Sequence, residues 1–344
     1  MVNRLSVLRF VLIVMVFMHH LQLYKGGGTL GVASFFVLSG FCMTLGYKDK
    51  ILNSNDKFDY VNFLKKRLIK FVPLHWICLI IVLLPTLRIG VQPNIHVLIS
   101  NIALLQSWIP QEEYYFSYNA LSWYLSDAMF LSMVFPLILL FISNQKIKTR
   151  ISLLVLLLEV YLLLVLIVPS SMRHALLYIN PLCRSFDFVV GVFTAFLFLQ
   201  WQERNSIQDL LKKHKYLPDV FIIFSIVVLV VLSSVINEKY LTIAGIYWPF
   251  IVVMIMAFAL QQDTFLRKVF ESKCVLIATQ STFSFYMIHI ICINQLNPLL
   301  SSFPDVVRVA VVFIITYLFS QLLYYIIERY ATKHLVSWLI RSKQ

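Results

Sequence analysis

The stretch Arg9-Phe-Val-Leu-Ile-Val-Met-Val-Phe-Met-His19-His20 places ionisable side chains at both ends of an apolar run. It belongs to a longer apolar segment, residues 5–24, which is long enough to cross the ~30 Å hydrocarbon core of a bilayer as a helix. Ionisable groups inside such a segment are costly and usually have a function. The stretch therefore predicts a membrane-spanning helix that carries functional residues.

Arg9 and His20 fall on one face of this predicted helix. They are eleven residues apart, and a turn of ~100° per residue brings them to within ~20° of the same direction. His19 lies ~80° away from the line that they share. The axial separation is ~16 Å at 1.5 Å per residue, which is too long for an ion pair but suits contact with two ends of one elongated substrate. Arg9 and His20 are therefore the candidate functional pair.

The composition of the whole chain is that of a polytopic membrane protein. Of its 344 residues, 60% are hydrophobic and only 13% are charged, and the mean hydropathy is +0.82. Long, uniformly apolar runs predict helices rather than barrel strands, because backbone polar groups must be paired within lipid. We predict an all-α bundle of about ten transmembrane helices. These lie at residues 5–24, 29–47, 71–89, 121–143, 151–168, 180–200, 218–236, 240–260, 275–297 and 306–327.

The basic residues alternate between successive loops. Most of the 29 lysines and arginines fall on the side of the N-terminus. Cytoplasmic segments retain positive charge, so this bias predicts that the N- and C-termini are both cytoplasmic. It also explains the net charge of +13 without a nucleic-acid partner. The opposite loops hold only Lys25, Arg88, Arg173, Lys239 and Arg308.

The chain is expected to form one membrane domain over residues 1–344, with no appended soluble domain. We find no internal repeat of the kind that many transporters contain. The inside loop at residues 48–70 ends in a basic amphipathic stretch that we expect to lie along the inner surface. In the outside loop at residues 90–120, the apolar residues 102–105 could dip back into the bilayer. The five cysteines have neither disulfide nor metal-ligand spacing, so no metal site is expected.

Several motifs follow one another in a characteristic order. Arg9, ten mostly apolar residues and His20 come first, followed by Gly31-Val-Ala-Ser-Phe35-Phe36-Val-Leu-Ser39-Gly40-Phe41. Later segments are residues 63–76, 101–108, 123–126 with Phe135-Pro136, Arg184 with Gly191, 283–289, and Glu328-Arg329. This series resembles the acyltransferase-3 family, the integral-membrane acyltransferases that modify bacterial cell-surface carbohydrates. The chain departs from many relatives after Trp123, where a single carboxylate, Asp127, replaces a pair.

The resemblance implies an O-acyltransferase of the bacterial cytoplasmic (inner) membrane. Such an enzyme would move an acyl group, typically acetyl, from acyl-CoA to a hydroxyl of a cell-surface polysaccharide or lipid-linked glycan. Acetyl-CoA would then be a donor substrate rather than a bound cofactor. The residues agree with this chemistry, because a neutral imidazole can take the proton as the hydroxyl attacks a thioester. His20 is the candidate general base, and Arg9 is the candidate donor-positioning residue.

Other residues are candidates for substrate contact, each with a structural alternative. Arg184 could face the site or simply pair with Asp187 on the same helix face. His289 could face the site or bond to a neighbouring helix. Ser39 is a small residue that could instead allow close helix packing. Trp123 is a candidate from the resemblance alone.

Two further groups of residues have alternative interpretations. Lys65, Lys66 and Arg67 could receive the phosphates of the donor or contact lipid headgroups. The aromatic residues between 108 and 118 could stack on sugars or form an interfacial belt. For Arg9 and His20, the alternative is a snorkelling arginine and a histidine that bonds to a neighbouring helix. A transporter or flippase for an acyl or glycan intermediate is the alternative function.

Overall fold

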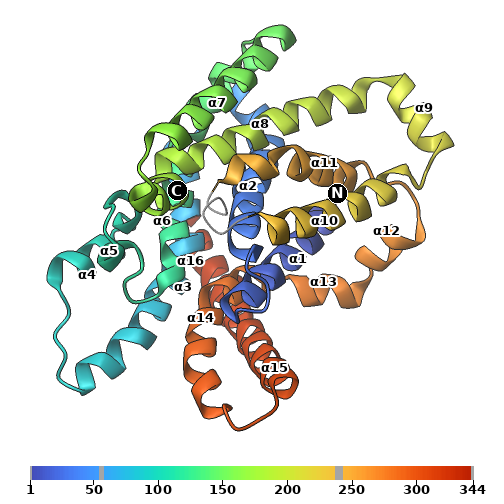
Figure 1. Cartoon of the computed structure of the whole chain (residues 1–344). Helices are drawn as coiled ribbons and strands as arrows, with labels where there is room; N and C mark the ends of the chain where they lie inside the picture. The colour runs from blue at the N-terminus through green and yellow to red at the C-terminus, as the bar shows by residue number, and fades with distance from the viewer. Residues whose placement is uncertain (1, 54–57, 237–242, 342–344) are drawn as a thin grey trace. The chain divides into compact units, whose positions relative to one another are not determined.

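The computed structural model describes residues 2–53, 58–236 and 243–341 (Figure 1). Every regular element among these residues is helical, as predicted. The chain divides into two compact units, each assembled from two stretches of sequence. Unit 1 comprises Met1–Phe58 and Val134–Thr279, and unit 2 comprises Asp59–Met133 and Gln280–Gln344.

Seven helices within the described residues are long and apolar enough to cross a membrane. A broken pair, α13 (Lys273–Thr279) and α14 (Thr282–Leu299), makes an eighth if it is counted as one span. The seven are α2 (Gly27–Leu52), α3 (Tyr60–Arg88), Ala120–Ser143 with α6 (Trp123–Ser143), α7 (Ile147–Ile167), α8 (Pro181–Glu203), α10 (Leu217–Val235) and Asp305–Ser337.

The remaining two predicted spans also contain helix. The first forms α1 (Val2–His20), and the eighth forms η6 (Ala244–Tyr247) followed by α11 (Trp248–Leu260). Residues 240–242 of that span, and Lys239 of the loop before it, lie outside the described residues. The structure thus supports a polytopic membrane protein, while ten spans and cytoplasmic termini stay predictions.

Unit 1 is organised around a close crossing of α2 and α8, which Figure 1 shows. A Cβ atom added at Gly40 would overlap the carbonyl oxygen of Phe188. A Cβ atom added at Gly191 would overlap the carbonyl oxygen of Val37 in the same way. The two glycines therefore allow the helix backbones to touch, as small residues do at membrane helix interfaces.

α1 packs against the first half of α2 as a helical hairpin. A Cβ atom at Gly27 would overlap the carbonyl oxygen of Met15, and one at Gly31 would overlap the Val16 side chain. The connection is short, and Gln22 within it adopts a left-handed backbone conformation with φ of 62°. The hairpin therefore places the histidine end of α1 beside the start of α2.

The rest of unit 1 surrounds this crossing. It includes α7, α10 and α11, and short helices connect or cap the spans. These are η3 (Ser170–Met172), η4 (His174–Ile179), α9 (Asn205–Lys213) and α12 (Phe265–Phe270).

Unit 2 is built from α3, α14 and α15 (Asp305–Leu323), with η7 (Tyr324–Ala331) and α16 (Thr332–Arg341) continuing the last span. The predicted outside loop at residues 90–120 folds into short helices. They are α4 (Ile95–Ile102), η1 (Gln106–Trp108), α5 (Glu112–Tyr115) and, at its end, η2 (Ala120–Ser122). Within this segment Asn101, Ser107 and Asn119 are buried and hydrogen-bonded, which holds it against the rest of unit 2.

The helix crossing can be tested by adding one methyl group to Gly40. Gly40→Ala should lower the free energy of unfolding by about 1–3 kcal/mol, because the methyl group meets backbone rather than a movable side chain. The matched control is Gly46→Ala in the same helix, where nothing lies within 4 Å of the added atom. That change should be neutral or stabilising by about 0.5–1 kcal/mol. Thermal unfolding in detergent measures both, and equal melting temperatures would contradict the proposed crossing.

Candidate active site

Arg9 reaches from α1 to α2. Its Nη2 donates a hydrogen bond to the Sγ of Cys42 at 3.1 Å, and both residues are half-buried. A thiol sulfur is only a weak acceptor. An anionic oxygen of a substrate can therefore replace the Cys42 sulfur as the acceptor with little loss of free energy.

Cys42 belongs to a stripe on one face of α2. Between residues 27 and 44, Phe35, Ser39 and Cys42 are half-buried and every other residue of α2 is buried. Their spacing of four and three residues puts them on one side of the helix. The Ser39 hydroxyl lies 3.9 Å from the sulfur of Met43. The Arg9 guanidinium thus contacts the least buried face of this part of α2, the face that also carries the candidate residue Ser39.

His20 is the last residue of α1, and its ring is oriented by its own helix. Nδ1 lies 3.0 Å from the carbonyl oxygen of Val16. A carbonyl oxygen can only accept, so Nδ1 carries the hydrogen and donates it. In the neutral ring the lone pair is then on Nε2. The local structure therefore presents the tautomer whose Nε2 can accept a proton.

The helix between these two residues is continuous. α1 runs without a break from Val2 to His20, so the predicted axial separation of ~16 Å between Arg9 and His20 applies. His19 has a different environment, because its ring packs on Gly28 of α2. A Cβ atom added at Gly28 would lie only 2.7 Å from the ring. The centroids of the two histidine rings are 5.3 Å apart, in an edge-to-face arrangement. His19 therefore packs the α1–α2 hairpin.

Arg184 is fully buried in unit 1 and makes several contacts that tie it to the protein. Its Nη1 lies 2.9 Å from Oδ2 of Asp187, and its Nη2 donates to the carbonyl oxygen of Leu177 at 2.6 Å. Asp187 also accepts a hydrogen bond from the indole of Trp248 at 2.5 Å. The guanidinium lies 5.5 Å from the ring centroid of Tyr178. These contacts favour the structural alternative for Arg184.

The candidates His289 and Trp123 lie in unit 2, and both are buried. Nδ1 of His289 lies 2.8 Å from the carbonyl oxygen of Tyr286 within α14, and its ring stacks on Phe285. Trp123 begins α6 and lies beside Tyr124, with ring centroids 6.5 Å apart. Nδ1 of His289 is thus bonded to the backbone of its own helix.

The basic candidates stand on the first turns of α3. Lys65 and Lys66 are exposed, and Arg67 is half-buried with its guanidinium 5.5 Å from the ring centroid of Phe63. Asp59 caps this helix by accepting from the backbone N–H of Asn62 at 2.8 Å. Lys65 and Lys66 therefore remain accessible to an anionic ligand.

A buried polar network in unit 2 was not predicted from the sequence. Asn101 is its centre, because it donates to Ser117 at 2.6 Å and accepts from Ser122 at 3.3 Å. Its carbonyl oxygen accepts from His75 at 2.9 Å. Asn119 donates to the carbonyl oxygen of Met287 at 2.8 Å, a contact between segments far apart in sequence. The motif at residues 101–108 thus contributes to internal order in unit 2.

Comparison with known proteins identifies the family. The family model for an acyltransferase domain, acyltransferase-3, matches residues 2–325. The chain belongs to the acyltransferase-3 family. The predicted resemblance is therefore confirmed, and it covers both units.

Curated relatives are similar at low identity. The acyltransferase MdmB of Streptomyces mycarofaciens is 30% identical over 115 residues, which are 32% of this chain and 28% of that protein. The O-acetyltransferase OatA of Staphylococcus aureus strain NCTC 8325 is 25% identical over 82% of this chain and 49% of its own length. The chain thus spans about half of the length of OatA and a smaller share of MdmB. No solved structure matches the chain.

The role of Arg184 can be tested by a double-mutant cycle with Asp187. Arg184→Gln should lower the free energy of unfolding by about 3–5 kcal/mol, because it leaves a buried carboxylate without its cation. Arg184→Gln combined with Asp187→Asn should cost less than the sum of the single changes. Thermal unfolding in detergent checks this. An Arg184→Gln protein as stable as the wild type would contradict the structural role and favour substrate contact by Arg184.

Proposed function

We propose that the protein is a membrane O-acyltransferase that moves an acyl group, typically acetyl, from acyl-CoA to a hydroxyl of a cell-surface polysaccharide or lipid-linked glycan. Its place would be the bacterial cytoplasmic membrane. Family membership and the names of the curated relatives support this class of reaction. The observation that carries the proposal is the pairing of Arg9 and His20 on one unbroken helix, with the His20 tautomer suited to a base.

His20 acts on the acceptor in this proposal. Nε2 takes the proton of the acceptor hydroxyl while its oxygen attacks the thioester carbonyl carbon. The carbon–sulfur bond then breaks, and the proton passes to the leaving sulfur. The products are an ester and free CoA thiol. The bond from Nδ1 to Val16 keeps the ring oriented and keeps a hydrogen on Nδ1 throughout, so that Nε2 alone gains and loses the transferred proton.

Arg9 acts on the donor. Its guanidinium exchanges the weak Cys42 contact for a polar group of acyl-CoA, to which it can donate charge-assisted hydrogen bonds. In the predicted topology Arg9 is near the inner surface, where acyl-CoA is present, and His20 is toward the outer half of the membrane. The ~16 Å between them matches an extended donor arm. Ser39 contributes a hydroxyl on the face of α2 that Arg9 contacts.

The other candidates have secondary roles in this proposal. The exposed Lys65 and Lys66, with Arg67, contribute positive charge for the donor phosphates. His289 and Trp123 are proposed acceptor contacts in unit 2. Arg184 maintains the packing of α8 rather than touching substrate.

The proposal can be tested with purified protein and with the living host. His20→Ala should lower acylation by about 10²–10⁴-fold, the usual contribution of a general base. His19→Asn is the matched control and should retain most of the activity, because it lies off the Arg9–His20 face. Release of free thiol from acetyl-CoA measures the reaction, and mass spectrometry of the surface glycans identifies the acyl group and the acceptor.

Two outcomes would contradict the proposal. Undiminished acylation by a membrane-inserted His20→Ala protein would exclude His20 as the base. A wild-type protein that supports glycan acylation in the host, but releases no thiol from acetyl-CoA when given acceptor, would favour the transporter alternative.

A further inference from the structure

A large apolar cavity lies in unit 1 among α8, α9, α10 and α11. Its volume is about 370 Å³, and its lining includes Trp201 from α8, Leu210 and Leu211 from α9, Phe221 from α10 and Met256 from α11. None of the residues proposed for acyl transfer lines it. It therefore needs an explanation of its own.

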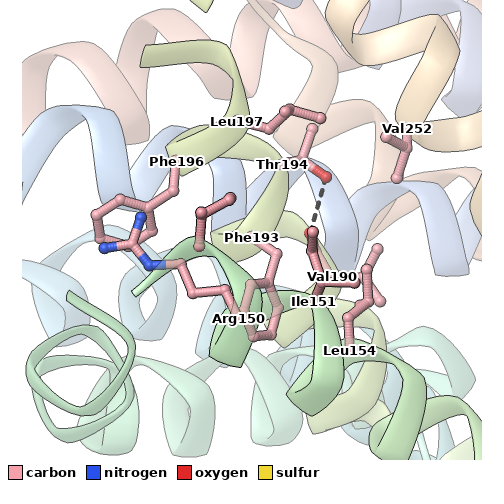
Figure 2. Close-up of a pocket in the computed structure, with 10 residues that line it drawn as sticks. Arg150, Ile151, Leu154, Val190, Phe193, Thr194, Phe196, Leu197 and Val252 are labelled. Carbon is pink, nitrogen blue, oxygen red and sulfur yellow. Dashed lines mark hydrogen bonds between the residues drawn. The ribbon is translucent and has the colours of Figure 1, made fainter. Parts of the chain in front are cut away.

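A second, smaller cavity adjoins the first along α8. Its volume is about 130 Å³, and it is lined by residues of α7, α8 and α11 (Figure 2). The two cavities share the lining residues Leu197 and Val252, so they lie next to each other; together they are here named the α8 groove. Figure 2 shows the Arg150 guanidinium beside the ring of Phe196, 4.3 Å from its centroid. The groove is thus elongated and apolar, with a cation at this rim.

Two lysines neighbour lining residues at the α9 end of the α8 groove, because Lys213 and Lys215 lie between Leu211 and Leu217 in the sequence. α9 turns Ile207, Leu210 and Leu211 toward the groove, and its remaining residues are mostly polar. Lys212 pairs with Asp209 at 3.8 Å. Lys213 and Lys215 are exposed, and within the described part of the chain neither forms an ion pair. An amphipathic helix with this distribution typically lies at a membrane surface, with lysines extending toward the headgroups.

We propose that the α8 groove binds an anionic phospholipid, with an acyl chain in the groove and the phosphate at Lys213 and Lys215. A long apolar cavity that ends at cations is complementary to an acyl chain that ends at a phosphodiester. The predicted topology puts residues 201–217 on the cytoplasmic side, where anionic lipids attract basic segments. A free phosphate or nucleotide would use the lysines but leave the apolar groove unexplained. The site is separate from the proposed acyl-transfer residues.

The charge component can be tested by native mass spectrometry of the detergent-purified chain. Phosphatidylglycerol and phosphatidylcholine with identical acyl chains are the probes. The wild type should retain phosphatidylglycerol several-fold more than phosphatidylcholine, and Lys213→Gln/Lys215→Gln should remove that preference. Lys48→Gln/Lys50→Gln, at the end of α2, removes the same charge elsewhere and should leave the preference intact.

The apolar component needs a separate variant. Leu210 lines the groove but is 48% exposed, so Leu210→Gln should fold and weaken binding of both lipids. Ile223→Gln is the control, because Ile223 is 59% exposed on α10 and outside the groove lining. Glycerol phosphate, which lacks acyl chains, should not displace the lipid.

Three results would overturn the lipid site. Equal retention of the two lipids by the wild type would contradict phosphate binding by Lys213 and Lys215. Phosphatidylglycerol retention that is unchanged in both Lys213→Gln/Lys215→Gln and Leu210→Gln would place the lipid elsewhere. Displacement of the lipid by glycerol phosphate would indicate a site for phosphate alone.

Discussion

The backbone contact between α2 and α8 at Gly40 and Gly191 is the constraint on which unit 1 depends. No side chain larger than hydrogen fits at either position without displacing backbone. Because α2 is held there, its first half is available for α1, which packs through further glycines. α8 carries the buried Arg184–Asp187 pair on the same span and one wall of the α8 groove. One helix crossing therefore positions the candidate active site and the proposed lipid site alike.

Within this framework, α1 carries both principal groups of the candidate active site, and α2 supplies the contact of Arg9. A single rigid helix sets the separation of a cation and a base, and local contacts set their orientation. Among the residues that the structure describes, the Arg9 guanidinium bonds to a weak acceptor, the Cys42 thiol, whereas the Arg184 guanidinium is bound by a carboxylate and a carbonyl. This contrast separates a residue that can exchange partners from one that maintains the fold.

Much of this arrangement could be predicted from the sequence, because it depends on short-range periodicity. The apolar runs predicted helices, and the structure confirms helix in each of them, although within the described residues seven or eight helices, rather than ten, are long and apolar enough to span a membrane. The three-residue spacing of Arg184 and Asp187 predicted, as one of two alternatives, the ion pair that is observed. The order within residues 90–120 could not be predicted, because contacts such as Asn119 with Met287 join distant segments. Cys42 was missed because a thiol in an apolar run carries no signal of its own.

The central claim is that Arg9 serves the donor and His20 serves the proton transfer. Calorimetric titration of the purified protein with acetyl-CoA separates these roles directly. Arg9→Gln should weaken donor binding by about 10-fold or more, the effect of losing a charge-assisted hydrogen bond of about 1.5–3 kcal/mol. His20→Gln should bind the donor as the wild type does while losing turnover. Unchanged donor binding by Arg9→Gln, or an equal loss in both variants, would contradict the account.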